Sequence, residues 1–189
     1  GLQATNAGID FQQRVSAFMM ILMEFEIDVS KVLGISSVND KIVKINFEDC
    51  ESIDDLVLTL ESCKKIYFQM KRTISLSDDS GSEFYKVCKQ FVSQHEKEGT
   101  VDLAYILMTR SEASGGIVQK LRRVLDGIRL SRSFDFIETL NKEEKDAFYK
   151  FSSNIKDIYK KDYKLTALDQ AFITELCRVK REIFTEDKK

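Results

Sequence analysis

The chain has 189 residues, of which 43% are apolar and 32% are charged, and its formal net charge is −2. This length and apolar content suffice for a substantial core, which indicates one domain or a domain with a helical extension. Membrane and secreted classes are disfavoured, because Glu24 interrupts the longest apolar run well short of the roughly 20 residues that span a bilayer and the N-terminus lacks a signal-peptide pattern. We therefore expect a cytoplasmic protein.

The few cysteine and histidine residues restrict the chemistry further. Cys50, Cys63, Cys88 and Cys177 are widely spaced and form no C-x-x-C pair, which favours reduced thiols over disulfides or a zinc site. The single histidine, His95, lies in the polar segment QHEKE and is predicted to be an exposed helix residue. Histidine-based catalytic triads and His-rich metal sites are therefore disfavoured.

The first predicted helix begins after Asn6 and ends near Glu26. Its apolar residues are spaced for one buried face, which indicates core packing. These residues are Phe11, Val15, Phe18, Met19 and Leu22. Three segments with strand character follow, at residues 42–47, 55–60 and 65–72, and they predict a three-stranded meander.

A helix and a buried strand come next, after the loop SLSDDSGS. Residues 82–98 carry apolar side chains at helical spacing behind serine caps. The segment VDLAYILMT, at residues 101–109, is nearly continuous in apolar residues, which suits a strand buried on both faces. A strand, a crossover helix and another strand indicate a βαβ unit. The predicted fold class is α/β, with a mixed sheet of a three-strand meander plus a parallel strand, flanked by helices.

The rest of the chain is predicted to be helical. Asn141 and Glu144 have capping-box spacing, and Thr166 is placed to cap a last helix. The apolar stripe of that last helix is Leu168, Phe172, Leu176, Val179 and Ile183. We assign residues 1–133 to the α/β core and residues 134–189 to a helical C-terminal extension packed on it.

The segment FQMKR carries the clearest chemical signal. Side chains two apart on a strand share a face, so Gln69 and Lys71 project together. If the strands at 55–60 and 65–72 form an antiparallel hairpin, Asp55 is carried to the same neighbourhood. Magnesium prefers oxygen ligands and one or two carboxylates. A cation held there would polarise a phosphodiester, and Lys71 would orient water or balance charge.

Several assignments stay open. Asp54 and Asp55 are adjacent, and we favour Asp55 because it is in phase with Val57 on the strand, which leaves Asp54 to point away or to cap the turn. Glu48, at the end of KIVKINFE, is either a third acid or a solvated strand end. The Gln-x-Lys pair alone is also compatible with an exposed edge strand, since lysine often protects sheet edges.

At these residues the chain resembles the PD-(D/E)xK nuclease superfamily, in the Mrr-like branch where the motif reads D…QxK. The segments AGIDFQQRVSAF, FEDCESIDDLVL and YFQMKR are similar to the double-stranded-DNA endonuclease domain at the N-terminus of bacterial anti-phage effectors. The resemblance covers residues 7–72, and no proline precedes the acid. It implies a restriction-endonuclease-like fold that uses Mg²⁺ or Mn²⁺. By residue, it implies Asp55 as metal-binding acid, Gln69 as second ligand, the Met70 backbone carbonyl as a further ligand, Lys71 as catalytic lysine and Gln12 as a polar helix residue near the site.

The charge balance limits how such a chain would bind DNA. Constitutive DNA binders usually have a strongly basic surface, but here 29 basic residues are offset by 31 acidic ones. Binding would depend on a local patch, a partner or assembly of copies. The candidates for phosphate contact are Arg72, Lys120 and Arg123, and for the last two the alternative is a solvated helix face.

The resemblance also suggests a larger assembly. We expect an excised N-terminal domain of a defence effector that forms homo-oligomers through a sensor or oligomerisation region. Two alternatives remain: a non-catalytic binding or assembly module with the same fold, and a nuclease that acts on RNA.

Overall fold

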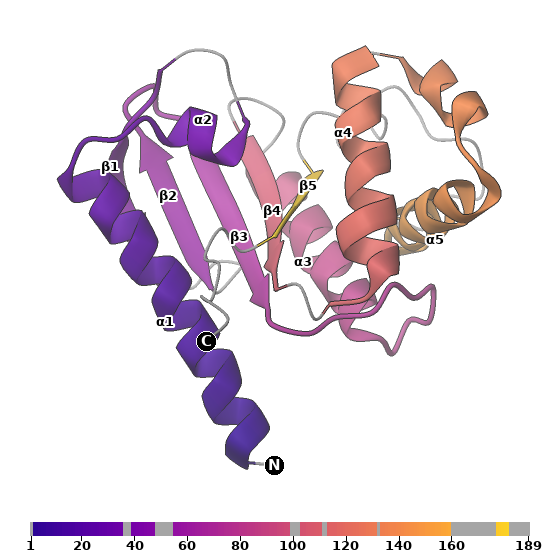
Figure 1. The fold of residues 1–189 in the computed structure, drawn as a ribbon, viewed down its shortest axis with the longest axis horizontal. Helices are drawn as coiled ribbons and strands as arrows, with labels where there is room; N and C mark the ends of the chain where they lie inside the picture. Colours follow the sequence, from indigo (N-terminus) through magenta and orange to yellow (C-terminus); the bar gives the residue numbers. More distant parts are fainter. Residues whose placement is uncertain are drawn as a thin grey trace, which may run out of the picture.

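The five described strands form one mixed sheet in the spatial order β1-β2-β3-β4-β5 (Figure 1). The computed structural model of the chain describes residues 2–35, 39–47, 55–98, 103–110, 113–131, 133–159 and 177–181. The first three strands pair antiparallel, and the last two are added in parallel. The strands are β1 (Ile42–Asn46), β2 (Leu56–Leu60), β3 (Lys65–Lys71), β4 (Leu103–Thr109) and β5 (Cys177–Arg181). The predicted α/β class, with a meander and a parallel addition, is confirmed.

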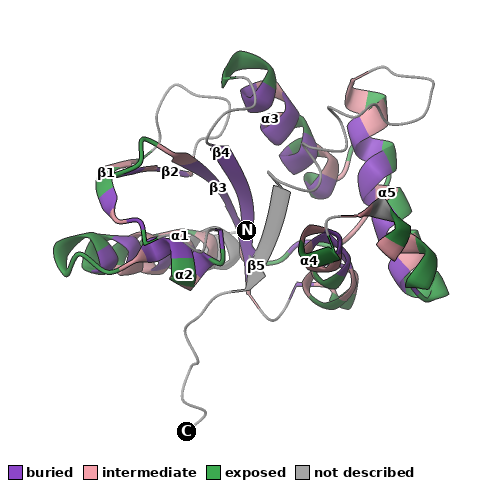
Figure 2. Ribbon diagram, turned by 90° about the horizontal axis from the view of Figure 1, so that it is seen from above, coloured by how far each residue is buried: buried purple, intermediate pink, exposed green. Residues whose placement is uncertain are grey.

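Helices cover both faces of this sheet (Figure 2). They are α1 (Leu2–Glu24), α2 (Val29–Leu33), α3 (Glu83–Glu98), the π-helical η1 (Gly116–Leu121), α4 (Arg122–Ser131), the 3₁₀-helical η2 (Phe134–Thr139) and α5 (Lys142–Ile158). Within the described ranges, each helix falls short of the length or the apolarity that a membrane span requires. The crossover from β3 through α3 to the parallel strand β4 is the predicted βαβ unit.

Helices α1 and α2 cover one face of the sheet. Phe11, Val15, Met19 and Leu22 are each at most 3% exposed, and they belong to one buried cluster with the even-numbered residues of β2, β3 and β4. Phe18 packs against the same cluster. The predicted apolar stripe of the first helix is therefore confirmed as core.

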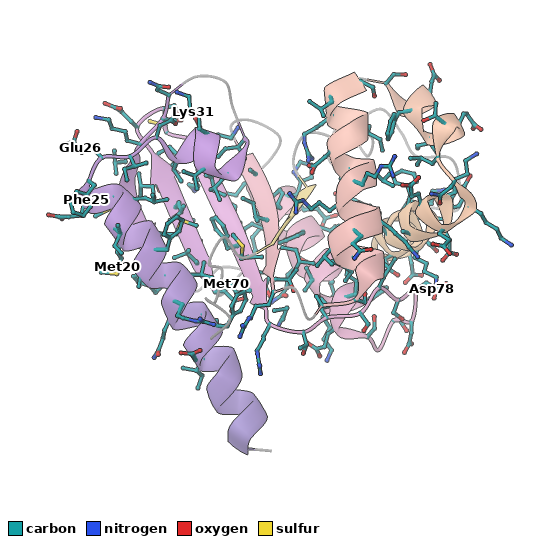
Figure 3. The ribbon with its side chains drawn as sticks, viewed as in Figure 1. Met20, Phe25, Glu26, Lys31, Met70 and Asp78 are labelled. Carbon is teal, nitrogen blue, oxygen red and sulfur yellow. The ribbon has the colours of Figure 1, made fainter. Side chains whose placement is uncertain are left out.

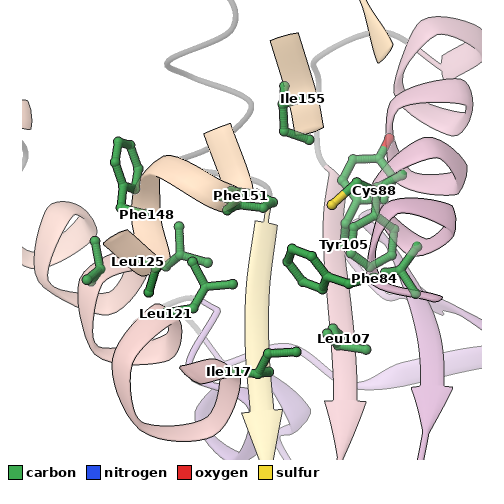
Figure 4. Packing of buried hydrophobic residues seen from close by; sticks show 14 of the residues in the cluster. Phe84, Cys88, Tyr105, Leu107, Ile117, Leu121, Leu125, Phe148, Phe151 and Ile155 are labelled. Carbon is green, nitrogen blue, oxygen red and sulfur yellow. The ribbon is translucent and has the colours of Figure 1, made fainter. Parts of the chain in front are cut away.

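Helices α3, η1, α4 and α5 pack on the opposite face (Figure 4). Phe84 and Cys88 of α3 meet Tyr105 of β4 and Phe151 of α5 in a second buried cluster. Burial raises the pKa of the Cys88 thiol, and both Cys88 and Cys63 are free thiols. The thiols of Cys50 and Cys177 lie outside the described part of the structure. All seven residues of β4 are buried, as expected for a strand covered on both sides.

The N-terminus of α5 has the predicted capping box. The Asn141 side chain accepts from the Glu144 backbone N–H at 2.9 Å, and the Glu144 carboxylate accepts from the Asn141 N–H at 3.1 Å. These two bonds satisfy backbone groups that a helix end leaves unpaired, and they fix where α5 begins.

Two predictions are wrong. Residues 177–181 form a strand parallel to β4, where a helix was predicted, so the C-terminal part of the chain also contributes to the sheet. The division at residue 133 stays a prediction. His95 is only 9% exposed and lies edge-on to Tyr105, with ring centroids 6.2 Å apart. It is buried because it continues the inward stripe of α3 that includes Cys88 and Val92.

An aspartate fixes the connection between α1 and β1. Asp28 caps α2, and its Oδ1 accepts from the Ser30 hydroxyl at 2.6 Å, the Ser30 N–H at 3.1 Å and the Asp40 N–H at 3.0 Å. These bonds, led by the one from the Ser30 hydroxyl, lower the pKa of Asp28 to about 2. The ionised carboxylate is therefore the form that the folded chain stabilises.

The Asp28 cap predicts a pH-dependent loss of stability. A carboxyl with a depressed folded pKa stabilises the fold above its unfolded pKa of about 3.9, and this contribution is lost as the pH falls toward 2. We expect the difference in unfolding free energy between the wild type and Asp28→Asn to be largest above about pH 4 and to shrink as the pH falls toward the folded pKa. Urea unfolding followed by circular dichroism measures it, with the exposed Asp78→Asn as control. An Asp28 difference that stays constant across this acidic range would contradict the prediction.

Candidate functional site

The predicted site residues lie at the carboxyl end of β3, beside the part of α1 that extends past the sheet (Figure 1). Strands β2 and β3 form the expected antiparallel hairpin, with Leu56 opposite Phe68 and Thr59 opposite Lys65. One further step along this ladder brings Asp55 opposite Gln69. The hairpin therefore carries the acid to the Gln-x-Lys segment, as predicted.

Asp55 is held by two donors from different elements. Its Oδ2 accepts from the backbone N–H of Met70 at 2.5 Å, and its Oδ1 accepts from Gln12 Nε2 at 2.8 Å. Met70 lies at the end of β3, near α1 (Figure 3). The bond from Met70 joins the carboxylate to the peptide between Gln69 and Met70. The bond from Gln12 fixes α1 against this end of the sheet.

Strand alternation separates the side chains of β3 into two sets. Phe68 and Met70 belong to the cluster under α1, whereas Tyr67 belongs to the cluster under α3. Gln69 and Lys71 therefore point to the α3 side. Gln69 is only 2% exposed, so its amide is buried on that side of the sheet. The N–H and C=O of one strand residue point to the same edge, so the Met70 carbonyl also faces the Asp55 side.

Lys71 has a partner that sequence analysis did not identify. Its Nζ lies 3.8 Å from Glu83 Oε2, at the first residue of α3, and the two side chains are 32% and 57% exposed. Glu83 also accepts from Lys86 at 2.7 Å, and this bond is the main cause of a lowered pKa at Glu83. The ionised Glu83 places a negative charge next to the Lys71 ammonium.

A cavity of about 460 Å³ opens beside Asp55 on the α1 side. Its lining combines uncharged polar and apolar side chains, and Asp55 supplies its only charged side chain among the described residues. The residues that line it are Ile9, Gln12, Gln13, Ser16, Ala17, Met20, Phe47 and Asp55. One side of the Asp55 carboxylate is therefore accessible from outside the protein.

The oxygen atoms at this end of the sheet are of the chemical types that Mg²⁺ prefers as ligands. Asp55 offers a carboxylate whose oxygens keep lone pairs beyond those used by Gln12 and Met70, and Gln69 and the Met70 carbonyl offer neutral oxygens. The described residues contain no group of three or more His, Cys, Asp or Glu side chains that could hold a metal ion. Glu48 and Asp54 lie outside the described residues. Any cation here would rest on one described carboxylate, neutral oxygens and water.

Comparisons with protein-family models, with curated proteins and with solved structures find no match for this chain. Its function must therefore be inferred from the residues of the site and their contacts.

The candidate phosphate-binding residues differ in their surroundings. Lys120 pairs with Glu143 at 2.7 Å, and Arg123 pairs with Glu144 at 2.8 Å, so both are neutralised by the first turn of α5. Arg72 directly follows β3, and its Nε is buried with no hydrogen bond to the described residues. Of the three residues, Arg72 is the one adjacent to Lys71 in the chain, so it is the best candidate to contact a phosphate there.

Two polar residues near Lys71 were missed from sequence. Glu83 follows the loop SLSDDSGS and reads as an ordinary acid in the first turn of a helix, so only the tertiary contact identifies it. Thr109 ends the apolar segment VDLAYILMT and pairs in register with Lys71. A threonine in a strand is common in any sequence, and the signal appears only when its neighbours across the sheet are known.

Proposed function

We propose that this chain is a magnesium-dependent endonuclease domain that cleaves double-stranded DNA. The observation that carries the proposal is the anchoring of the Asp55 carboxylate to the Met70 N–H, between Gln69 and Lys71 in the chain. Two further features support the proposal. The acid, the strand and the Gln-x-Lys pair follow one another in the order that the nuclease resemblance implies, and Gln12 of α1, which the resemblance places near the site, contacts Asp55.

Each residue has a distinct part in the proposed reaction. Asp55 and Gln69, with the Met70 carbonyl, would hold the cation, and Gln12 would keep the Asp55 carboxylate oriented toward it. When bound, the cation supplies charge neutralisation for the phosphate. Lys71 would position the attacking water and balance developing negative charge, because an ammonium offers three donors that adapt to a moving group.

The surroundings of the site make weak DNA binding part of the proposal. Glu83 lies beside Lys71, and Lys120 and Arg123 are paired with acids, so these three cations are already partly neutralised. Affinity that rests on few phosphate contacts is low at physiological salt. We therefore propose a cytoplasmic effector domain of anti-phage defence that depends on assembly of several copies to concentrate it on DNA.

Metal dependence tests the proposal. The wild type is expected to nick or linearise supercoiled plasmid with Mg²⁺ or Mn²⁺ at low salt, to lose this activity with a chelator and to regain it when the cation is restored. Duplex RNA and single-stranded DNA of the same sequence serve as alternative substrates. Mn²⁺ binding, measured by calorimetry on the same samples, reports the site without cleavage. A chain that neither binds Mn²⁺ nor cleaves any of these substrates would exclude the proposed function, and exclusive cleavage of RNA would replace DNA as the substrate.

A further inference from the structure

The second half of α1 is apolar on every side. Residues 17–23 read AFMMILM, so nearly two helical turns contain only apolar side chains. One face of this part, which includes Met19, is buried against the sheet. Met20, Ile21 and Met23 are exposed on its other sides. A helix that is apolar all round is normally buried all round. The outer side of α1 therefore needs a cover that the described part of one chain does not supply.

The exposed apolar side chains continue past the end of α1. We call the following set the α1 patch: Met20, Ile21, Met23, Phe25 and Ile27, each between 38% and 71% exposed. The chain turns back where the helix ends, because the Ile27 N–H donates to the Leu22 carbonyl at 2.9 Å. Phe25 and Ile27 thus stay next to the last turn of the helix. Met20 and Phe25 both lie at the outer edge of the molecule (Figure 3).

The size of the α1 patch matches one side of a dimer interface. A fully exposed large side chain has about 200 Å² of accessible surface, so the exposed fractions leave roughly 500 Å² of apolar area in water. A standard interface buries about 800 Å² on each partner, and about 65% of a homodimer interface is apolar. Such an interface needs roughly the apolar area that the α1 patch offers.

The pattern of side chains on α1 suits a second copy of the same chain. Gln13, Ala17, Met20, Ile21 and Glu24 are spaced three and four residues apart, so they share one outer face. Glu24 is the only one of these five that carries a charge. If two copies of α1 pack antiparallel around Met20 and Ile21, each Glu24 lies opposite an Ala17, and the two carboxylates stay about 10 Å apart along the helices. A two-fold axis, the commonest symmetry of oligomers, produces this arrangement.

We propose that two copies of this chain form a dimer through the α1 patch, with their α1 helices antiparallel around Met20 and Ile21. This interface lies within the chain itself, in contrast to the separate oligomerisation region that the nuclease resemblance suggests. It does not depend on the proposed nuclease function. Gln12, which holds Asp55, lies about 12 Å before Met20 along α1, so both sites stay outside the centre of the interface. Met20 also lines the cavity beside Asp55, so the second copy adds a wall at the far end of this cavity.

Charged substitutions in the α1 patch test the inference. In sedimentation velocity over a dilution series, the wild type is expected to have twice the mass of one chain. Met20→Glu and Ile21→Glu are each expected to raise the dimer dissociation constant by about 100-fold or more, because the dimer would bury an unpaired carboxylate. Leu130→Glu is the matched control, since Leu130 is equally apolar and exposed but lies on α4. It should leave the dimer intact. Circular dichroism should show the helix content of the wild type in all three variants.

A cysteine in the α1 patch tests the two-fold arrangement. Residues beside a two-fold axis face their own copies, so mild oxidation of Met20→Cys should give a disulfide-linked dimer. Leu130→Cys should give none. The wild type, which has the exposed thiol of Cys63, is oxidised in parallel to show any cross-link through the native cysteines.

Three results would overturn the inference. A wild type that stays monomeric throughout the dilution series excludes the dimer and leaves the α1 patch to a different partner. A dimer that persists in both Met20→Glu and Ile21→Glu has its interface elsewhere. A dimer that Met20→Cys does not cross-link lacks the antiparallel arrangement. Plasmid cleavage has no part in these measurements, so the dimer and the nuclease proposal can fail separately.

Discussion

The Asp55→Asn variant is expected to lose cation-dependent DNA cleavage by roughly a thousandfold, because the charge stabilisation that a bound metal ion supplies is worth several kcal/mol. Asparagine keeps the shape of aspartate but replaces an anionic oxygen with an amide nitrogen, which cannot bind a cation. The variant should also lose most Mn²⁺ binding. Initial rates of plasmid nicking and calorimetric titration with Mn²⁺ measure the two effects.

The fold is expected to tolerate this change. The carbonyl oxygen of the introduced asparagine can accept from Met70, and its amide can donate to Gln12 once the Gln12 amide is turned. We expect a stability loss of at most about 1.5–3 kcal/mol, the range for a hydrogen bond to a charged group. Asp10→Asn is the matched control, because Asp10 lies on α1 close before Gln12 and is paired with Arg14. Equal cleavage by Asp55→Asn and the wild type would remove the metal-site assignment.

The Lys71→Met variant is expected to lower kcat by about 10²–10⁴-fold, the range for removal of a group that positions or transfers a proton. Methionine retains an unbranched apolar stem of similar length, so packing around the strand end is largely kept. The KM for DNA should rise little if Lys71 acts mainly on the water. Steady-state cleavage of a labelled duplex over a range of DNA concentrations separates the two parameters.

The control for Lys71 uses the same acidic neighbour. Lys86→Met removes a cation that contacts Glu83 at 2.7 Å, so it changes the charge around Glu83 without touching β3. Cleavage by Lys86→Met should stay near that of the wild type. An equal loss in both variants would assign the effect to the net charge beside Glu83 rather than to the Lys71 ammonium.

The hairpin and its polar residues were accessible from sequence because their signals are local. Two short apolar runs joined by a short turn set the register of β2 against β3, and that register fixes where Asp55 lies relative to Gln69. The contact between Gln12 and Asp55 joins residues far apart in the chain. Only the nuclease resemblance placed Gln12 near the site, and the structure adds the hydrogen bond itself.

The wrong predictions concern residues whose structure depends on contacts with distant parts of the chain. Residues 177–181 were predicted to be helical from the apolar spacing of a longer stretch, from Leu168 to Ile183, but they form a strand because the edge of β4 provides backbone partners. His95 was misjudged from its charged neighbours, although its place on the inward stripe of α3 decides its burial. The contact of Glu83 with Lys71 depends on how α3 docks on β3, which local sequence signals do not contain.

The parallel pairing of β4 with β5 has a consequence for the order of assembly. Thr109 pairs with Arg181, so the strand edge next to the proposed site is covered by a segment that is synthesised long after β4. Strands β1 to β4 and the helix between β3 and β4 are complete much earlier in synthesis. Until β5 arrives, the open edge of β4 offers unpaired backbone groups to any other extended chain. Late closure of so long a loop is entropically costly and slows folding. The edge of β4 is thus open to wrong pairing in the nascent sheet until β5 has been synthesised.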